Sequence, residues 1–301
     1  MNVTFRQLKV FEAVARLLSY TNAAKELYLT QPAVSMQIKQ LEENVGLMLL
    51  EQVGKKIYLT EAGNEMYHYA RSIARELDEA AGIMEQLKGV ESGKLEITVA
   101  TTANAFVTKM LAMFKKTHDG VTISLDVTNR ERLLEQLRAN EKDIAIMGRP
   151  PISEGLVAES FAENPLVIVA SPDHPLAGKK NIPLNILQNE TFVVREQGSG
   201  TRTAMQRFFD KHNMEITTSM EMNENEAIKQ SVQAGMGLGI VSVHTLELEL
   251  DTNRLVILNV EDFPIMRHWY LVHLEEKRLS PITQAFKQFV LSEGRNLIPH
   301  L

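Results

Sequence analysis

Apolar positions in the first forty-five residues predict three helices. From Phe5 to Leu18, apolar residues recur every three or four positions, which gives a helix one hydrophobic face. A second helix is expected after Thr21 as N-cap, and a third after Thr30, with Pro32 in its first turn, where a missing N–H costs little. The inward positions are Leu8, Phe11, Val14, Ala15, Leu18, Ala23, Ala24, Leu27, Val34, Ile38, Leu41 and Val45.

The outward face of the third helix is lightly charged and rich in hydrogen-bonding groups, which suits a helix that reads base edges in a DNA groove. The stretch Thr21–Val45 is therefore either a DNA-binding helix-turn-helix or an ordinary αα-hairpin. Met36 would either contact a thymine methyl group or pack within its own domain. The candidate DNA-binding residues here are Thr21, Gln31, Pro32, Ala33, Ser35, Met36, Lys39 and Gln40.

Two short apolar runs after these helices predict a β-hairpin. Leu49–Val53 and Lys56–Leu59 can pair about Gly54-Lys55. Lys55 and Lys56 at the tip would then reach the DNA backbone as a wing, although a solvated lysine pair is the plain alternative. Residues 1–60 are thus expected to form a winged helix-turn-helix domain.

Residues 61–88 have apolar positions at heptad spacing and predict one long helix. A small N-terminal domain cannot bury such a long stripe, so we expect the helix to dimerise; packing on the chain's own second domain is the alternative. Residues 89–94 are expected to form a hinge. The expected dimerisation residues are Met66, Ala70, Ile73, Leu77, Ala80, Met84 and Leu87.

Strand-like and helical patterns alternate over residues 95–301 and predict an α/β domain. The run Gly235–Gly239 precedes a strand, which favours a helix-to-strand turn over a nucleotide-binding loop. The predicted strands are 95–100, 122–128, 143–147, 166–170, 191–194, 239–242 and 269–273, and the predicted helices are 105–116, 130–139, 201–212, 224–234 and 280–292.

Three segments at predicted strand ends are candidate walls of an anion pocket. Helix N-termini, hydroxyl groups and guanidinium groups all suit a phosphate or carboxylate. Helix capping is the alternative for the threonines and the serine, and an interlobe ion pair is the alternative for Arg149. Arg195 and His268 are weaker candidates that could equally be structural. The expected effector-binding residues are Thr101, Thr102, Asn104, Gly148, Arg149, Ser199, Gly200, Thr201 and Arg202.

Composition narrows the class of protein. The chain has 301 residues, a net charge of −6 and no cysteine, which excludes disulfides and thiol chemistry. Residues 1–60 carry a net +2 and residues 61–301 a net −8, as expected for a DNA-contacting end on an acidic body. The histidines lack zinc-binding spacing, and no nucleophile–base pair stands out, so we expect neither a metal nor an enzyme. The lack of a signal peptide or long apolar run predicts a cytoplasmic protein.

Several runs of this sequence resemble one family. F-R-Q-L-K-V-F-E-A-V-A (5–15), A-A-K-E-L-Y-L-T-Q-P-A-V-S-M-Q-I-K-Q-L-E (23–42) and L-T-E-A-G (59–63) resemble the LysR-type transcriptional regulators. Markers at 125–131, 146–151, 195–202 and 225–239 resemble the CbbR-type subgroup, whose members regulate RuBisCO and Calvin-cycle operons. Leu50 and Gln52 depart from the usual wing, where Phe and Arg are common.

The resemblance implies a transcription activator with a two-lobed, periplasmic-binding-protein-like regulatory domain. It implies that dimers of dimers bind dyad-symmetric double-stranded DNA and contact RNA polymerase. The implied effector is a small anion: a phosphorylated sugar, a Calvin-cycle intermediate or a reduced nicotinamide nucleotide. A LysR-type regulator of another metabolic operon is the first alternative. A solute-binding protein or an enzyme on the two-lobed fold are the others.

Overall fold

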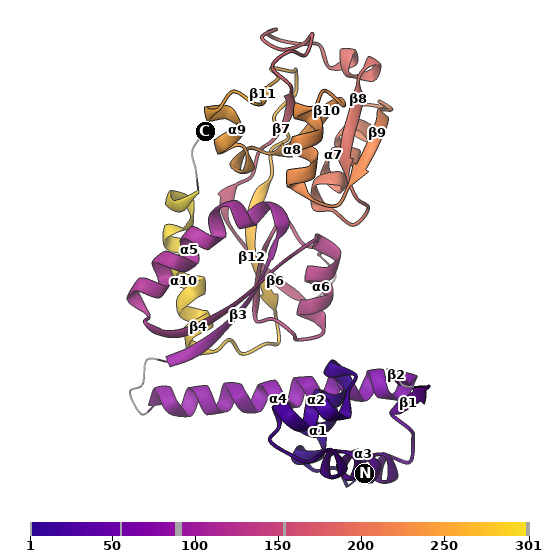
Figure 1. Cartoon of the computed structure of the whole chain (residues 1–301). Coiled ribbons are helices and arrows are strands. Elements are labelled where there is room, and N and C mark those ends of the chain that lie inside the picture. The colour runs from indigo at the N-terminus through magenta and orange to yellow at the C-terminus, as the bar shows by residue number, and fades with distance from the viewer. Residues whose placement is uncertain (1, 55, 88–91, 153–154, 299–301) are drawn as a thin grey trace. The chain divides into compact units, whose positions relative to one another are not determined.

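The computed structural model describes residues 2–54, 56–87, 92–152 and 155–298. The chain divides into two compact units, the first made chiefly of residues 1–90 and the second of most of residues 91–301 (Figure 1). No helix in the described ranges is long and apolar enough to cross a membrane.

The N-terminal unit contains three short helices, a hairpin and one long helix, as the apolar pattern predicts. Thr30 caps the third helix by accepting a hydrogen bond from the Ala33 N–H, and left-handed Gly46 ends that helix. The second helix starts two residues earlier than predicted, because Ser19 and not Thr21 caps it. The elements are α1 (Phe5–Leu17), α2 (Tyr20–Glu26), α3 (Gln31–Val45), β1 (Leu50–Val53), β2 (Lys56–Leu59) and α4 (Glu61–Leu87).

The predicted inward positions of this unit form its core, with one exception. Phe11, Val34 and Leu41 are fully buried, whereas Leu18 is 47% exposed. Leu18 follows the last residue of α1 and has a left-handed backbone with φ +47°, so its side chain leaves the apolar face where the chain turns toward α2. The helix period therefore holds only as far as Leu17.

Hydrogen bonds hold the hairpin against α3 and α4. The Glu42 carboxylate accepts from the N–H groups of Leu49 and Leu50 at 2.8 and 3.1 Å. Thr60 Oγ1 accepts from Gly63 N at 2.9 Å and donates to the Met48 carbonyl at 2.8 Å. These bonds join the end of the recognition-type helix α3, the hairpin and the start of α4 into one rigid corner.

The second unit has two α/β lobes, each with a five-stranded sheet. In lobe 1 the strand order is β4-β3-β5-β12-β6, with β3 parallel to β4 and β5, and β12 antiparallel to its neighbours β5 and β6. Its elements are β3 (Ser92–Ala100), α5 (Asn104–Thr117), β4 (Gly120–Thr128), α6 (Arg130–Arg138), β5 (Ile144–Met147), β6 (Leu156–Glu163), β12 (His268–Leu274) and α10 (Pro281–Leu297).

Lobe 2 has the strand order β11-β7-β10-β8-β9, with β10 parallel to β8 and antiparallel to β7. The turn from α8 to β10 contains Gly235 and Gly237, both with positive φ, so the predicted helix-to-strand turn is confirmed. Its elements are β7 (Leu166–Ala170), β8 (Thr191–Arg195), α7 (Gly200–Lys211), β9 (Thr217–Met222), α8 (Asn225–Gln233), β10 (Leu238–Ser242), α9 (Glu247–Asp251) and β11 (Val256–Ile257).

The chain crosses between the lobes twice, at residues 163–166 and 265–268, and the two crossings bond to each other. The Leu166 N–H donates to the Ile265 carbonyl at 3.0 Å, and the Asn164 N–H donates to the Arg267 carbonyl at 2.7 Å. The buried Asn164 amide oxygen also accepts from Ser242 Oγ at 2.8 Å. This paired segment is called the hinge below; it is distinct from the hinge expected at residues 89–94.

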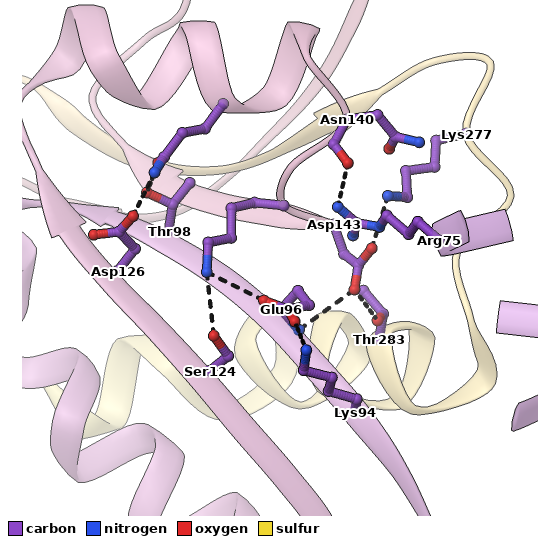
Figure 2. Close-up of polar contacts among 12 residues, drawn as sticks. Arg75, Lys94, Glu96, Thr98, Ser124, Asp126, Asn140, Asp143, Lys277 and Thr283 are labelled. Atoms are coloured by element: carbon purple, nitrogen blue, oxygen red, sulfur yellow. Dashed lines mark hydrogen bonds and ion pairs between the residues drawn. The ribbon is translucent and has the colours of Figure 1, made fainter. Parts of the chain in front are cut away.

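Polar residues also fix the interior of lobe 1 (Figure 2). Buried Asp143 pairs with Lys277 at 2.7 Å and lies 3.5 Å from Thr283 Oγ1, which joins the loop before β5 to α10. Lys94 and Lys142 both pair with Glu96 on β3, and although burial opposes it, these two cations lower the pKa of Glu96. No periodicity signals such a cluster.

The start of one strand and the presence of three others differ from the prediction. The strand β3 starts at Ser92, inside the expected 89–94 hinge, because Ser92 and Gly93 pair with Gly120 and Val121 of β4. Residues 89–91 of that expected hinge, and residue 88 at the end of the expected long helix, lie outside the described residues. Strands β6, β9 and β11 were not predicted; all three lie at sheet edges, where one side faces water and the apolar pattern is weak.

Candidate functional site

The outward face of α3 is exposed as predicted. Gln31, Pro32, Ser35, Lys39 and Gln40 are exposed, and Ala33 lies half-buried at the flank. Met36 is 54% exposed, so the alternative in which Met36 packs within the domain is wrong. Thr21 is exposed on α2. The face combines hydrogen-bonding groups, one apolar side chain and a single lysine, which suits contacts to base edges flanked by a phosphate contact.

The predicted wing is present. Strands β1 and β2 pair antiparallel, with Val53 opposite Lys56, and Lys56 is exposed. Lys55 lies outside the described residues. The tyrosine in the turn between α2 and α3 was missed: Tyr28 is 96% exposed and has φ +53°. Only its place in the turn could have signalled it, because a residue outside both helices has no periodicity.

The stripe on α4 has two parts. Ala70 is fully buried and Met66 packs against the same core as α1 and α3, so these two positions serve their own unit. Ile73, Leu77 and Met84 are 39%, 47% and 54% exposed, and Ala80 is exposed as well. The side chain of Leu87 lies outside the described residues. The exposed part is an apolar surface of a kind that partner helices cover.

A cleft lies between the two lobes of the second unit, at the carboxyl ends of parallel strands β3, β4 and β5. Open α/β sheets bind ligands at this edge. Its cavity volume is about 20 Å³, room for about one ordered water, so its own side chains nearly fill it. It is lined by Ala100, Thr101, Thr102, Thr128, Asn129, Arg130, Met147, Gly148, Arg195, Ser199, Gly200, Thr201, Arg267 and Trp269.

Six of the nine expected effector-binding residues line this cleft: Thr101, Thr102, Gly148, Ser199, Gly200 and Thr201. Helix capping, the alternative to ligand contact that the sequence left open, accounts for part of what these side chains do. Ser199 Oγ caps α7 by accepting from the N–H groups of Thr201 and Arg202 at 3.3 and 3.5 Å. Thr101 Oγ1 accepts from Arg195 Nη1 at 3.2 Å, which links the two lobes across the cleft.

The other three expected residues do not line the cleft. Asn104 is exposed on α5, where its side chain accepts from Thr108 Oγ1. Arg149 is exposed, and its contact with the cleft region is through its carbonyl, which accepts from Arg130 Nη1 at 2.7 Å. Arg202 lies one helix position too far round α7 and lines a separate cavity of about 340 Å³ beside β9. His268 is exposed and does not line the cleft.

Two arginines of the cleft were missed, and a third has a carboxylate partner. Arg195 is 3% exposed and pairs with Glu196 at 2.7 Å. Arg130 begins α6 directly after β4, a strand-to-helix position that the sequence signals and the prediction overlooked, whereas Arg267 lies on the hinge, where no regular pattern marks it. The pKa of Arg267 is lowered to about 10, mainly by burial and to a smaller extent by the nearby positive charge of Arg130. Arg267 therefore remains a cation at neutral pH.

The cleft collects hydrogen-bond donors and positive charge, and its lining residues include no carboxylate. Arginines bind carboxylates and phosphates through two parallel hydrogen bonds. Within the described ranges, no group of three or more His, Asp or Glu could hold a metal ion. The composition of the cleft lining therefore suits a small anion.

An N-terminal helix-turn-helix with an exposed polar face, followed by a two-lobed α/β unit, defines the class of DNA-binding regulators that respond to a small molecule. The chain belongs to the LysR family of transcriptional regulators. Residues 5–64 match the bacterial regulatory helix-turn-helix proteins of the lysR family, and residues 88–295 match the LysR substrate binding domain.

The chain is similar to several individual members of the family and to solved structures. It is 54% identical to the RuBisCO operon transcriptional regulator of Allochromatium vinosum, covering 99% of this chain and 98% of the relative. It is 42% identical to the regulatory domain of Synechocystis CcmR, solved in complex with 2-PG, with a TM-score of 0.66 over 68% of this chain and 99% of that one. The full-length CbnR structure, 21% identical, shares the fold with a TM-score of 0.71 over 96% and 99% of the two chains.

Proposed function

We propose that this protein regulates transcription of a carbon-fixation operon and binds its promoter DNA through α3 and the wing. The observation that carries the proposal is the 54% identity, over nearly the whole of both chains, to a RuBisCO operon regulator. The exposed face of α3 supports it, because Ser35, Met36 and Gln40 are free to contact bases while buried Val34, Ile38 and Leu41 fix the helix.

The proposed effector is a small phosphorylated carboxylate that binds in the cleft between the lobes. The CcmR regulatory domain, 42% identical, was solved with 2-PG, 2-phosphoglycolate. The cleft of this chain offers threonine hydroxyls, the N-terminus of α7 and arginine side chains to such an anion. Because the cleft has room for about one water, the effector must separate the lobes or displace arginine side chains as it enters.

The proposed assembly is a dimer of dimers on dyad-symmetric DNA. The exposed stripe of Ile73, Leu77, Ala80 and Met84 on α4 supports a dimer contact, because a monomer leaves this apolar surface in water. Two copies would then present two α3 helices to paired half-sites. Contact with RNA polymerase is proposed as the way in which the bound protein activates transcription. The proposed location of the protein is inside the cell.

A gel-shift titration tests the proposal. Labelled DNA from upstream of a RuBisCO operon and a scrambled fragment of equal length are titrated at moderate salt, with and without 2-phosphoglycolate. We expect a selective shift of the operon fragment and a change in its apparent Kd when 2-phosphoglycolate is added. The lack of a selective shift would contradict DNA-binding regulation. If a fragment from another promoter were shifted selectively instead, the protein would regulate another operon.

Variants sharpen the DNA test. Lys39→Ala should weaken binding to both fragments and reduce the slope of log K against log salt by about 0.9, as loss of one phosphate contact does. Ser35→Ala should reduce the selectivity for the operon fragment. Lys180→Ala, an exposed lysine in the second unit, is the control and should leave both unchanged.

A further inference from the structure

Arg267 differs from the other residues of the cleft because its backbone is part of the hinge. Its carbonyl accepts from the Asn164 N–H at 2.7 Å, on the other crossing between the lobes. Its side chain extends from there into the cleft. A displacement of the guanidinium group therefore acts directly on the segment that joins the two lobes.

The guanidinium also bridges the two lobes. Arg267 Nη1 donates to the carbonyl of Gly200, the first residue of α7 in lobe 2, at 3.2 Å. On the lobe 1 side it lies against Gly148 at the end of β5, where a Cβ would lie 3.4 Å from Arg267 Cζ and closer still to Nη2. A glycine at 148 therefore leaves the space that this guanidinium fills.

The charge on Arg267 is not balanced as that of Arg195 is. Arg195 donates to both carboxylate oxygens of Glu196, whereas the hydrogen bond recorded for Arg267 goes to a neutral carbonyl. Among the described residues, no carboxylate forms an ion pair with Arg267, and Arg130 adds a second positive charge nearby. A half-buried cation without a counter-ion is unfavourable, and an anionic ligand reduces the cost.

The cleft also contains one tryptophan side chain with a buried donor. The indole N–H of Trp269 is buried and makes no hydrogen bond to the described residues. Trp269 is 1% exposed, lines the cleft and follows Arg267 by two positions, where β12 begins with a register shift against β6. It is also the only tryptophan in the sequence, so its fluorescence reports on this one place.

We propose that Arg267 is the residue that senses the charge of the effector and transmits it to the hinge, and that the effector must carry at least two negative charges. This inference rests on the proposed function, since it concerns the same cleft. A single negative charge can balance one guanidinium, whereas a phosphorylated acid can bind Arg267 and still offset the repulsion from Arg130. The ligand then replaces the Arg267–Gly200 contact as the link between the lobes.

The first experiment compares anions on the full-length protein. Isothermal titration calorimetry gives the Kd for 2-phosphoglycolate, glycolate and inorganic phosphate, and Trp269 fluorescence is recorded in the same titrations. We expect 2-phosphoglycolate to bind at least about 10-fold more tightly than glycolate, because it adds charge-assisted hydrogen bonds. Equal affinity for glycolate would overturn the requirement for two charges.

The second experiment uses Arg267→Met and, as a matched control, Arg195→Met. Methionine keeps an unbranched apolar stem and removes the charge. We expect Arg267→Met to weaken 2-phosphoglycolate binding by about 10- to 100-fold and yet raise the unfolding temperature without ligand by about 2 °C or more. Arg195→Met should lower that temperature, because it leaves half-buried Glu196 without its cation. Arg267→Lys should recover part of the affinity.

The outcomes separate the two proposals. If the wild-type protein binds none of the three anions, the proposed effector class is wrong. If the wild type binds 2-phosphoglycolate and Arg267→Met binds it equally well, the proposed role of Arg267 is wrong while the effector stands. If Arg267→Met loses both stability and affinity and Arg267→Lys recovers neither, Arg267 is merely structural, which also overturns the inference.

Discussion

Gly63, near the start of α4, allows the tightest backbone approach in the DNA-binding unit. A Cβ at this position would lie 2.9 Å from the carbonyl carbon of Leu49 and closer still to its oxygen, whereas ordinary contacts begin at about 3.4 Å. The Leu49 carbonyl cannot retreat freely, because it accepts from the Thr60 N–H at 3.1 Å. Gly63→Ala must therefore shift the hairpin against α4.

Overpacking of this kind costs about 1–3 kcal/mol, and loss of the Thr60–Leu49 hydrogen bond adds about 0.5–1.5 kcal/mol. A loss of about 2–4 kcal/mol raises the population of the opened unit by about 30- to 1,000-fold. Hydrogen exchange measured by mass spectrometry on the full chain checks this: protection of α1 and α3 should fall by that factor, with β7 and β10 unchanged.

Asn64→Ala changes the next, exposed residue of the same helix and should preserve the protection. Wild-type exchange in Gly63→Ala would refute the reasoning, because it would mean that the close approach to Leu49 does not exist in solution. The same experiment explains in physical terms why the L-T-E-A-G run ends in glycine.

Three further predictions follow from contacts described above. Leu77→Asp places a charge in the exposed stripe of α4 and should shift the protein to smaller species in sedimentation equilibrium, whereas the neighbouring Glu76→Gln should not; unchanged assembly would show that the stripe is not a contact. Gly148→Ala should displace the Arg267 guanidinium and weaken 2-phosphoglycolate binding by about 10-fold, with little loss of stability, since only a side-chain end must move. An unchanged Kd for 2-phosphoglycolate, measured by calorimetry, would contradict this prediction. Burial, although opposed by a backbone hydrogen bond, lowers the pKa of His273, so its neutral form stabilises the fold above pH 6.5 and this contribution is lost as the pH falls below that value. Thermal midpoints at pH 7.5 and 5.5 should therefore differ less in His273→Asn than in the wild type or in the exposed control His68→Asn.

The N-terminal unit could be predicted almost completely from its sequence because each of its elements buries one side. The repeat of Val34, Ile38 and Leu41 alone fixes which side chains of α3 face water. The prediction that Leu18 is buried was wrong because a helix period says nothing about where the chain leaves the helix. Met66 and Ala70 show a second limit: a heptad cannot distinguish a partner helix from the chain's own core.

Much of the cleft was predicted from backbone signals; Arg130 was overlooked although it begins a helix directly after a strand, and Arg267 was missed because only tertiary structure brings it in. Thr101 and Ser199 follow strands and precede helices, and Thr201 lies in the first turn of α7, which is visible in the sequence. Arg267 lies on a connection with no regular pattern, and only the return of the chain through the hinge brings it beside Gly148 and Gly200. Arg202 shows the converse, since one residue along a helix turns a side chain by about 100° and out of the cleft.

The strand order of lobe 1 has a consequence for the protein's synthesis. Strand β12 lies between β5 and β6, yet it comes after the whole of lobe 2 in the chain. At about 5–20 residues per second, the ribosome completes the DNA-binding unit roughly 10–35 s before it supplies β12. A nascent chain therefore has its DNA-reading helix folded well before the cleft that would govern it can exist, so newly made protein gains its regulation only on release.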